Sequence, residues 1–202
     1  MTEVSINKTM HLSEHFMLGE LCKTGVKTAD GNIPSHVHIE NLKRVCEWLE
    51  ELRRRYNQQY VCENEERSVS PPELGGARGG LNEGMSGASS DHPAHTGTPP
   101  NLGGEINTDA PIIITSGYRS PELNKKVGGS PTSNHLTGCA VDIRVAGIEQ
   151  AMRYAVILMD YADETKQDYD EILIERNRYG AIWLHFAVRP KDNRRKTMFL
   201  QK

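Results

Sequence analysis

The sequence lacks the features that mark nucleic-acid-binding, thiolate-zinc and membrane-spanning proteins. Its 202 residues carry a formal net charge of −3, so no overall basic field favours nucleic acid. It contains no CxxC pair, which argues against a structural zinc site built from thiolates. No apolar run approaches the ~20 residues that span a membrane, and we expect no membrane insertion. The N-terminus lacks the basic-then-apolar pattern of a signal peptide, so we expect synthesis in the cytoplasm without one.

Two basic runs, at residues 53–55 and 194–196, interrupt this charge balance. We expect the first to be a solvated helix face and the second to be a soluble C-terminal tail. The cysteines are expected to be reduced and mostly buried, because nothing else in the sequence indicates a disulfide scaffold. They are Cys22, Cys46, Cys62 and Cys139. For Cys139 we expect a small core residue in a tight loop, with metal ligation by its thiolate as the alternative.

The chain is long enough for one domain with a sizeable core, and we expect a single domain over residues 1–202. Residues 63–109 are rich in Ser, Gly, Pro, Asn and Glu and show almost no apolar periodicity. Such a segment cannot bury enough apolar area to offset the entropy of ordering it. We therefore expect a mobile insertion there, in which His92 and His95 are exposed to solvent.

Apolar spacing predicts the elements on either side of this insertion. Helical patterns cover residues 39–56 and 148–162. Residues 121–126 are predicted to form a short helix, because Pro121 suits its first turn and Gly128 and Gly129 would end it. Ser13 is the candidate N-cap of a further, short helix that follows it. Strands are predicted over residues 111–115, 140–145, 170–174 and 183–188, the first of them buried.

Two of these strands carry possible metal ligands on the face opposite their apolar residues. In the strand at residues 140–145, the period of two places Asp142 on the face opposite the core. In the strand at residues 183–188, it places His185 on the face opposite the core in the same way. His135 precedes the first of these strands in a loop. A lone His is usually structural or exposed, and a lone Asp on a strand usually pairs with a cation, so the three are candidates only.

Several motifs supply a context for these candidates. They read LSEHFMLGEL (residues 12–21), SGYRSPELN (116–124), VGGS (127–130), SNHLTGCAVDI (133–143) and WLHFA (183–187). In this order they resemble the zinc D-Ala-D-Ala peptidases of the M15 type. That group includes D,D-carboxypeptidases, L-alanoyl-D-glutamate endopeptidases of phage lysins and, at the level of fold, the Hedgehog signalling domain. The first motif resembles the opening of the phage and prophage subgroup.

The resemblance implies an α+β fold of the Hedgehog/DD-peptidase type, with a small, mainly antiparallel sheet flanked by helices. It implies His135, Asp142 and His185 as the ligands of one zinc ion. Two neutral imidazoles and one carboxylate would leave that ion with net positive charge and an open fourth position, as in catalytic sites. Zinc in such a site lowers the pKa of water toward ~7.

The resemblance also implies substrate-binding residues. Arg119 would hold a substrate carboxylate or carbonyl, which suits a guanidinium that donates two parallel hydrogen bonds. The alternative for Arg119 is an ordinary salt bridge. Ser133 would bind near the ligand loop or stabilise a turn. Trp183, like Tyr118, would form a wall for a peptide stem or pack in the core.

The general base is the position at which the sequence departs from the family pattern. Many relatives carry an acid a few positions before the last ligand, but residues 180–182 contain none. The nearest acid upstream is Glu175, which we expect to be the base and proton shuttle. Its alternative role is a strand-end ion pair with a neighbouring arginine, and Glu171 on the same strand face is the second candidate base.

These assignments imply a zinc metallopeptidase that hydrolyses peptide bonds of peptidoglycan stem peptides, as a D,D-carboxypeptidase or a lysin-like endopeptidase. We expect it to act on the bacterial cell wall after phage-mediated release, without binding nucleic acid. The alternatives are a non-catalytic zinc-containing module that binds the cell wall or a partner, and a zinc amidohydrolase with another substrate. The sequence leaves open the bond cut and the oligomeric state.

Overall fold

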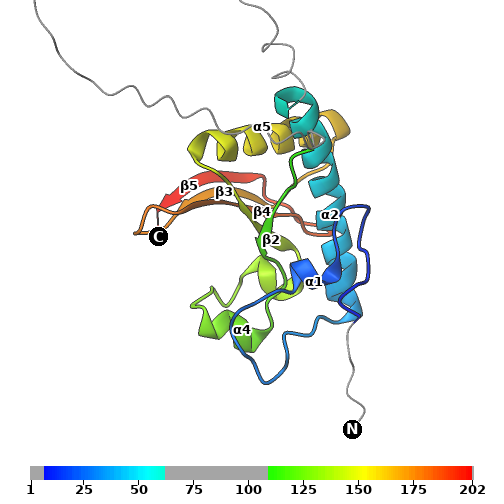
Figure 1. Ribbon diagram of the computed structural model, residues 1–202, viewed down its shortest axis with the longest axis vertical. Coiled ribbons are helices and arrows are strands. Elements are labelled where there is room, and N and C mark those ends of the chain that lie inside the picture. The colour runs from blue at the N-terminus through cyan, green and yellow to red at the C-terminus, as the bar shows by residue number, and fades with distance from the viewer. Residues whose placement is uncertain (1–6, 62–108, 202) are drawn as a thin grey trace, which may run out of the picture.

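A computed structural model of the chain describes residues 7–61 and 109–201, and it has a mixed α+β fold (Figure 1). The insertion expected at residues 63–109 lies outside the described residues, apart from its last residue. Asp109 accepts hydrogen bonds from Arg53 and Asn57, so this end of the segment is tied to the helical layer.

The sheet has five strands in the order β1-β2-β4-β3-β5. They are β1 (Ile114–Ser116), β2 (Ala140–Arg144), β3 (Glu171–Arg176), β4 (Ile182–Ala187) and β5 (Lys196–Gln201). The pairs β1–β2, β2–β4 and β4–β3 are antiparallel, and β3–β5 is parallel. The predicted α+β class with a mainly antiparallel sheet is therefore confirmed.

Two long helices, α2 (His36–Tyr56) and α5 (Ile148–Thr165), build the core with one face of the sheet. Alternate strand residues point into this layer because side chains on a strand change sides at each position. The fully or almost fully buried apolar side chains include Trp48, Leu49, Val141, Ile143, Leu158, Ile172, Leu184 and Phe186. The helix α4 (Pro121–Lys126) lies on the other side of the sheet from α5 (Figure 1).

The helix predictions are confirmed with shifted bounds. The helix α2 begins before residue 39, because Ser35 Oγ accepts from the His38 amide at 3.4 Å and His38 Nδ1 accepts from the Ser35 amide at 3.2 Å. These reciprocal bonds form a capping box. Of the apolar residues in α5, Ile148, Met152 and Val156 are exposed.

Two predictions about the N-terminal part and the first strand are wrong. Ser13 caps no helix: α1 spans only Leu18–Leu21, and Ser13 Oγ donates to Glu50 Oε1 at 2.6 Å. The first strand is an edge strand and only partly buried, with Ile113 next to it exposed. An apolar run alone does not show whether a strand has neighbours on both sides.

The prediction of a soluble C-terminal tail is also wrong, because residues 196–201 form β5, which pairs with β3. The basic run at residues 194–196 makes ion pairs with Asp170 and Glu171 around the start of β3 and with Asp163 of α5. The basic run at residues 53–55 is only partly solvated, since Arg55 bridges Glu51 and Glu164 of α5 with 15% of its side chain exposed.

The remaining elements are short. They are a π-helical turn at Asn57–Val61 and a 3-10 helix at Asn134–Thr137. Cys46 and Cys139 are buried and Cys22 is partly buried, all as free thiols, while Cys62 lies outside the described residues. Across residues 7–61 and 109–201, no helix combines the length and apolar character that crossing a bilayer requires.

Candidate metal centre

Three side chains converge on the face of the sheet that α2 and α5 leave uncovered. Asp142 of β2 and His185 of β4 lie directly opposite each other in the antiparallel register. His135 reaches the same point from the 3-10 helix. One ligand atom from each residue lies within 4.8 Å of the others, and all three residues are buried.

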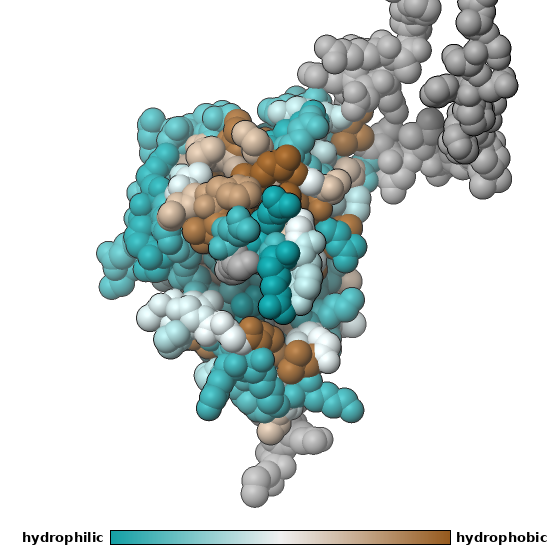
Figure 2. Space-filling model, turned by 90° about the vertical axis from the view of Figure 1, so that its left-hand side faces the viewer, coloured by the Kyte–Doolittle hydropathy of each residue, from teal (hydrophilic) through white to brown (hydrophobic). Residues whose placement is uncertain are grey.

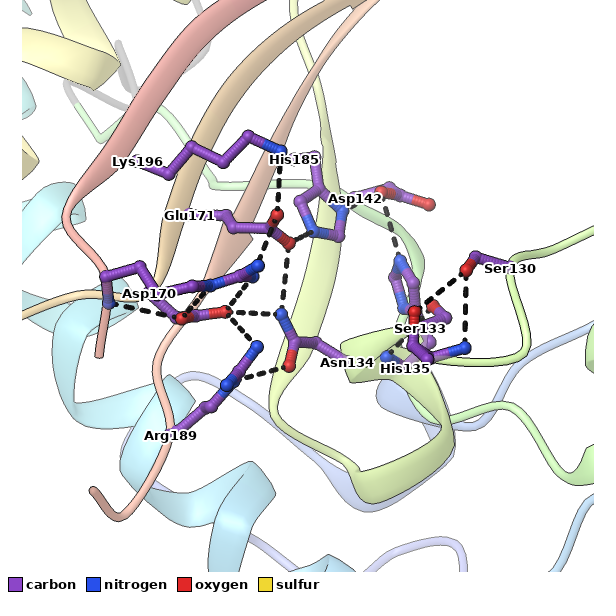
Figure 3. Close-up of polar contacts among 12 residues, drawn as sticks. Ser130, Ser133, Asn134, His135, Asp142, Asp170, Glu171, His185, Arg189 and Lys196 are labelled. Carbon is purple, nitrogen blue, oxygen red and sulfur yellow. Dashed lines mark hydrogen bonds and ion pairs between the residues drawn. The ribbon is translucent and has the colours of Figure 1, made fainter. Parts of the chain in front are cut away.

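The contacts identify which atoms face one another. His135 Nε2 lies 3.3 Å from Asp142 Oδ1, and His185 Nδ1 lies 2.9 Å from the same oxygen. The other ring nitrogens face away toward acceptors: His135 Nδ1 lies 2.6 Å from the Gly117 carbonyl, and His185 Nε2 lies 3.6 Å from Glu171 Oε2 (Figure 3). Metal-binding histidines typically have such partners, which fix the tautomer and the orientation of the ring.

The loop that carries His135 is held rigidly on both sides. Ser133 Oγ accepts from the His135 amide at 3.3 Å and caps the 3-10 helix. Gly138 ends the helix with φ 71°, in the left-handed region that favours glycine. A Cβ at Gly138 would lie 2.6 Å from the His38 carbonyl oxygen, so the turn packs directly against α2.

The electrostatics of the cluster suit a divalent cation. Burial opposes ionisation of Asp142, but His135 and His185 more than offset it and hold the pKa of its carboxyl well below the usual range. Burial lowers the pKa of His135. Burial also disfavours charge on His185, yet its hydrogen bond with Asp142 and its contact with Glu171 raise its pKa to about 9. Two imidazoles and an ionised carboxylate form a donor set that fits zinc.

The pKa of His185 makes zinc binding sensitive to pH. A histidine with a pKa near 9 is protonated at neutral pH, and it must lose that proton to bind a metal. We expect zinc binding at pH 7 to release about one proton, and the affinity to rise about tenfold per pH unit toward pH 9. Calorimetric titration of the metal-free protein in buffers with different ionisation enthalpies measures this proton. Binding enthalpies that do not depend on the buffer would contradict the expectation.

The cluster lies in a cleft of about 640 Å³ between the open face of the sheet and the segment that follows α4. Figure 2 shows a hollow on this side of the molecule, bordered mostly by hydrophilic residues. The charged side chains that line the cleft, besides the histidines, are Arg119, Asp142, Glu171, Glu175, Arg194 and Lys196. The segment 127–130, with two glycines, and the residues 132–134 form the opposite wall.

The structure brings most of the predicted substrate-binding residues to this cleft. Arg119 Nη2 donates to Asp142 Oδ2 at 2.5 Å and its Nε donates to Ser116 Oγ at 2.9 Å, so it does make a salt bridge. Ser133 and Trp183 line the cleft. Tyr118 does not line it: its ring is buried and stacks on His38.

The two candidate bases differ in their surroundings. Leu173 of β3 lies opposite His185, and Glu171 and Glu175 are two positions before and after Leu173. Residues two apart on a strand point to the same side, so both glutamates share the cleft face with Leu173. The contact with His185, together with Arg194 and Lys196, outweighs burial and lowers the pKa of Glu171 to about 2. A carboxylate with so low a pKa is a poor proton acceptor near neutral pH. Glu175 is 4% exposed and lines the cleft.

The sequence reasoning missed a network that joins the C-terminal segment to the ligand loop. Asp170 is fully buried, and it accepts two bonds from Arg194, at 2.8 and 2.7 Å, and one from Asn134 at 2.7 Å. Arg189 Nη2 lies 2.9 Å from the same carboxylate (Figure 3). The adjacent acids at the start of β3 and the basic run at residues 194–196 were the available signals.

Replacing Asp170 by Asn is expected to lower the free energy of unfolding by about 2–3 kcal/mol, because two arginines lose their buried counter-charge. Urea unfolding followed by circular dichroism measures the loss. The control is Asp168→Asn, whose exposed carboxylate pairs with Arg195, and we expect it to change the stability by less than about 1 kcal/mol. Equal losses in the two variants would contradict a structural role for the network.

Comparison with known proteins adds an independent finding. A family model described as Peptidase M15 matches residues 105–167. The matched stretch includes His135 and Asp142 and ends before His185. No curated protein matches the chain. The match supports the assignment of the chain to the M15 peptidases, a family that is zinc-dependent in general.

Proposed function

We propose that the protein is a zinc-dependent peptidase that cleaves peptide bonds in peptidoglycan stem peptides, as a D,D-carboxypeptidase or an endopeptidase. We also propose that its fold is of the Hedgehog/DD-peptidase type and that it acts on the bacterial cell wall after phage-mediated release. The observation that carries the proposal is the convergence of His135, Asp142 and His185 at the floor of a polar cleft. The match to the M15 family supports the peptidase activity.

The three ligand candidates would hold one zinc ion through His135 Nε2, a carboxylate oxygen of Asp142 and His185 Nδ1. A zinc ion supplies Lewis-acid polarisation of a carbonyl and lowers the pKa of water. Gly117 and Glu171 hold the far nitrogens of the two rings and so keep both imidazoles in position.

Glu175 is the general base in this proposal. It accepts a proton from the attacking water and returns a proton to the departing amine, which is the usual task of a carboxylate beside such a site. Its side chain is buried in the wall of the cleft that holds the ligand cluster. The neighbouring Trp183, opposite Glu175 on β4, forms part of the wall that a peptide stem would contact.

Arg119 orients the substrate at the other side of the cleft. Its bonds to Asp142 and Ser116 use two of the five N–H donors of the guanidinium. The remaining donors suit a substrate carbonyl or carboxylate. Ser133 supports this arrangement by fixing the turn that carries His135.

The direct test is mass spectrometry of purified peptidoglycan fragments incubated with the zinc-loaded protein. We expect new fragments that disappear when a chelator is added and return when zinc is restored, and their masses would name the bond cut. Intact fragments from a protein that retains stoichiometric zinc would overturn the proposal in favour of a binding module. Cleavage of other amides alone would favour a different zinc amidohydrolase.

A further inference from the structure

A group of basic side chains borders the cleft on the side of β5. Lys196 begins this strand and Arg194 precedes it, and both line the cleft. Their side chains remain 39% and 46% exposed, respectively. Figure 3 shows Lys196 reaching from β5 toward Glu171 and His185. The ammonium group therefore lies on the flank of the candidate metal centre and is open to solvent.

The cleft carries excess positive charge when a metal is bound. Arg119, Arg194 and Lys196 line it, against the carboxylates of Asp142, Glu171 and Glu175. A divalent ion bound by the histidines would leave two positive charges in excess. A cleft with excess positive charge concentrates anionic ligands.

Of the three cations that line the cleft, Lys196 makes the fewest hydrogen bonds to protein groups in the part of the chain that the structure describes. Arg119 is bonded to Asp142 and Ser116, and Arg194 makes two bonds to Asp170. Among the residues that the structure describes, Lys196 Nζ donates only to Glu171 Oε1, at 3.3 Å. Arg194 Nη2 lies 3.0 Å from the same oxygen, so the two cations share a single carboxylate oxygen. An ammonium has three donors, and two remain for a ligand.

The sheet sets the distance from this group to the candidate metal centre. His185 lies on β4 and Lys196 on β5, with β3 between them. His185 pairs with Leu173 and Lys196 pairs with Glu171, so two strand spacings and an offset of two residues along the strands make about 12 Å between the backbones. Both side chains line the same cleft. One residue of an extended peptide covers about 3.5 Å. A peptide bond held at the metal centre would thus place a group about three residues away near Lys196.

We propose that Lys196, with Arg194 beside it, forms a subsite for a free carboxylate carried by the substrate about three residues from the cleaved bond. The inference rests on the proposed function and refines it, because it makes the enzyme selective for stem peptides that carry a free carboxylate at this distance over those that carry a carboxamide there. A charge-assisted bond to a carboxylate is stronger than a neutral one to an amide.

The experiment compares two synthetic stem peptides that differ only in this carboxylate or carboxamide. The quantity measured is the ratio of kcat/KM for the acid to kcat/KM for the amide. We expect a preference for the acid in the unaltered enzyme and a roughly tenfold fall of the ratio in Lys196→Met. Lys196→Arg should retain most of the preference. Lys191→Met, an exposed lysine of the same segment outside this cleft, is the control and should keep the ratio.

A ratio that is the same in the unaltered enzyme and in both Lys196 variants would overturn the subsite. If the unaltered enzyme cleaves neither peptide, the proposed function fails on these substrates, and the peptides then serve as ligands for calorimetry with the zinc-loaded protein. Tighter binding of the acid that is lost in Lys196→Met would support the subsite, whereas equal or undetectable binding of both peptides would overturn it. Thermal unfolding of each variant verifies that the fold is intact.

Discussion

Replacement of Glu175 by Gln is expected to lower kcat on peptidoglycan fragments by about 10²–10⁴-fold, while the zinc content stays unchanged. Gln has nearly the same shape as Glu but cannot accept the proton of the attacking water. Because Glu175 is buried on the cleft face of β3 and lies outside the ligand cluster, the loss should fall on the chemical step. Turnover measured with the fragments identified by mass spectrometry, together with metal analysis, tests this expectation.

Glu171→Gln separates the two candidate bases. Glu171 contacts His185 Nε2, so its replacement should weaken zinc binding by about 10–100-fold, with activity largely restored by added zinc. Glu149→Gln, on the exposed surface of α5, is the matched control and should behave like the unaltered protein. Full activity of Glu175→Gln, combined with an inactive but zinc-loaded Glu171→Gln, would reverse the assignment.

Replacement of Asp142 by Asn should have the largest effect on the metal. Asp142 is the anionic member of the cluster, and its Oδ1 contacts both histidines. A neutral amide removes that charge and leaves the guanidinium of Arg119 without its carboxylate partner. Since loss of an outer partner alone costs 10–100-fold in affinity, we expect loss of this ligand to cost more than about 100-fold.

Competition with a chromophoric chelator measures the zinc affinity of Asp142→Asn. The control is Asp160→Asn, an exposed carboxylate of α5, which should bind zinc like the unaltered protein. Unfolding of the metal-free variants separates a loss of affinity from a loss of fold. Unchanged zinc affinity in a folded Asp142→Asn would mean that the metal binds elsewhere.

Local sequence patterns were sufficient for much of the fold. The period of two in residues 140–145 and 183–188 predicted that Asp142 and His185 leave the core face, and the register places them opposite each other. Apolar spacing likewise predicted α2 and α5, and the signals at Pro121, Gly128 and Gly129 predicted α4. These features depend on residues close together in the chain, which is why they are readable without a structure.

Other features depend on which distant segments meet. The strand β5 pairs in parallel with β3, which lies about 25 residues earlier in the sequence. Its neighbouring apolar residues Met198 and Phe199 are both exposed, so β5 lacks the alternation of buried and exposed residues that would have predicted a strand. Ser13 looks like a helix cap, but it meets Glu50 of α2 and bonds to it instead. A tertiary contact of this kind can replace a local hydrogen bond, because it gives the same polar group a partner from a distant part of the sequence.

By itself, the sequence determined the α+β class, the helical layer and the identity of the side chains that could bind a metal. Only the tertiary structure decided which imidazole nitrogens face Asp142, that Glu171 is held in ion pairs with His185, Arg194 and Lys196, and that Arg194 and Lys196 border the site. The physical reason is that periodicity reports the side of an element on which a residue lies. Electrostatic and hydrogen-bond partners depend on distances between elements, and folding alone sets those distances.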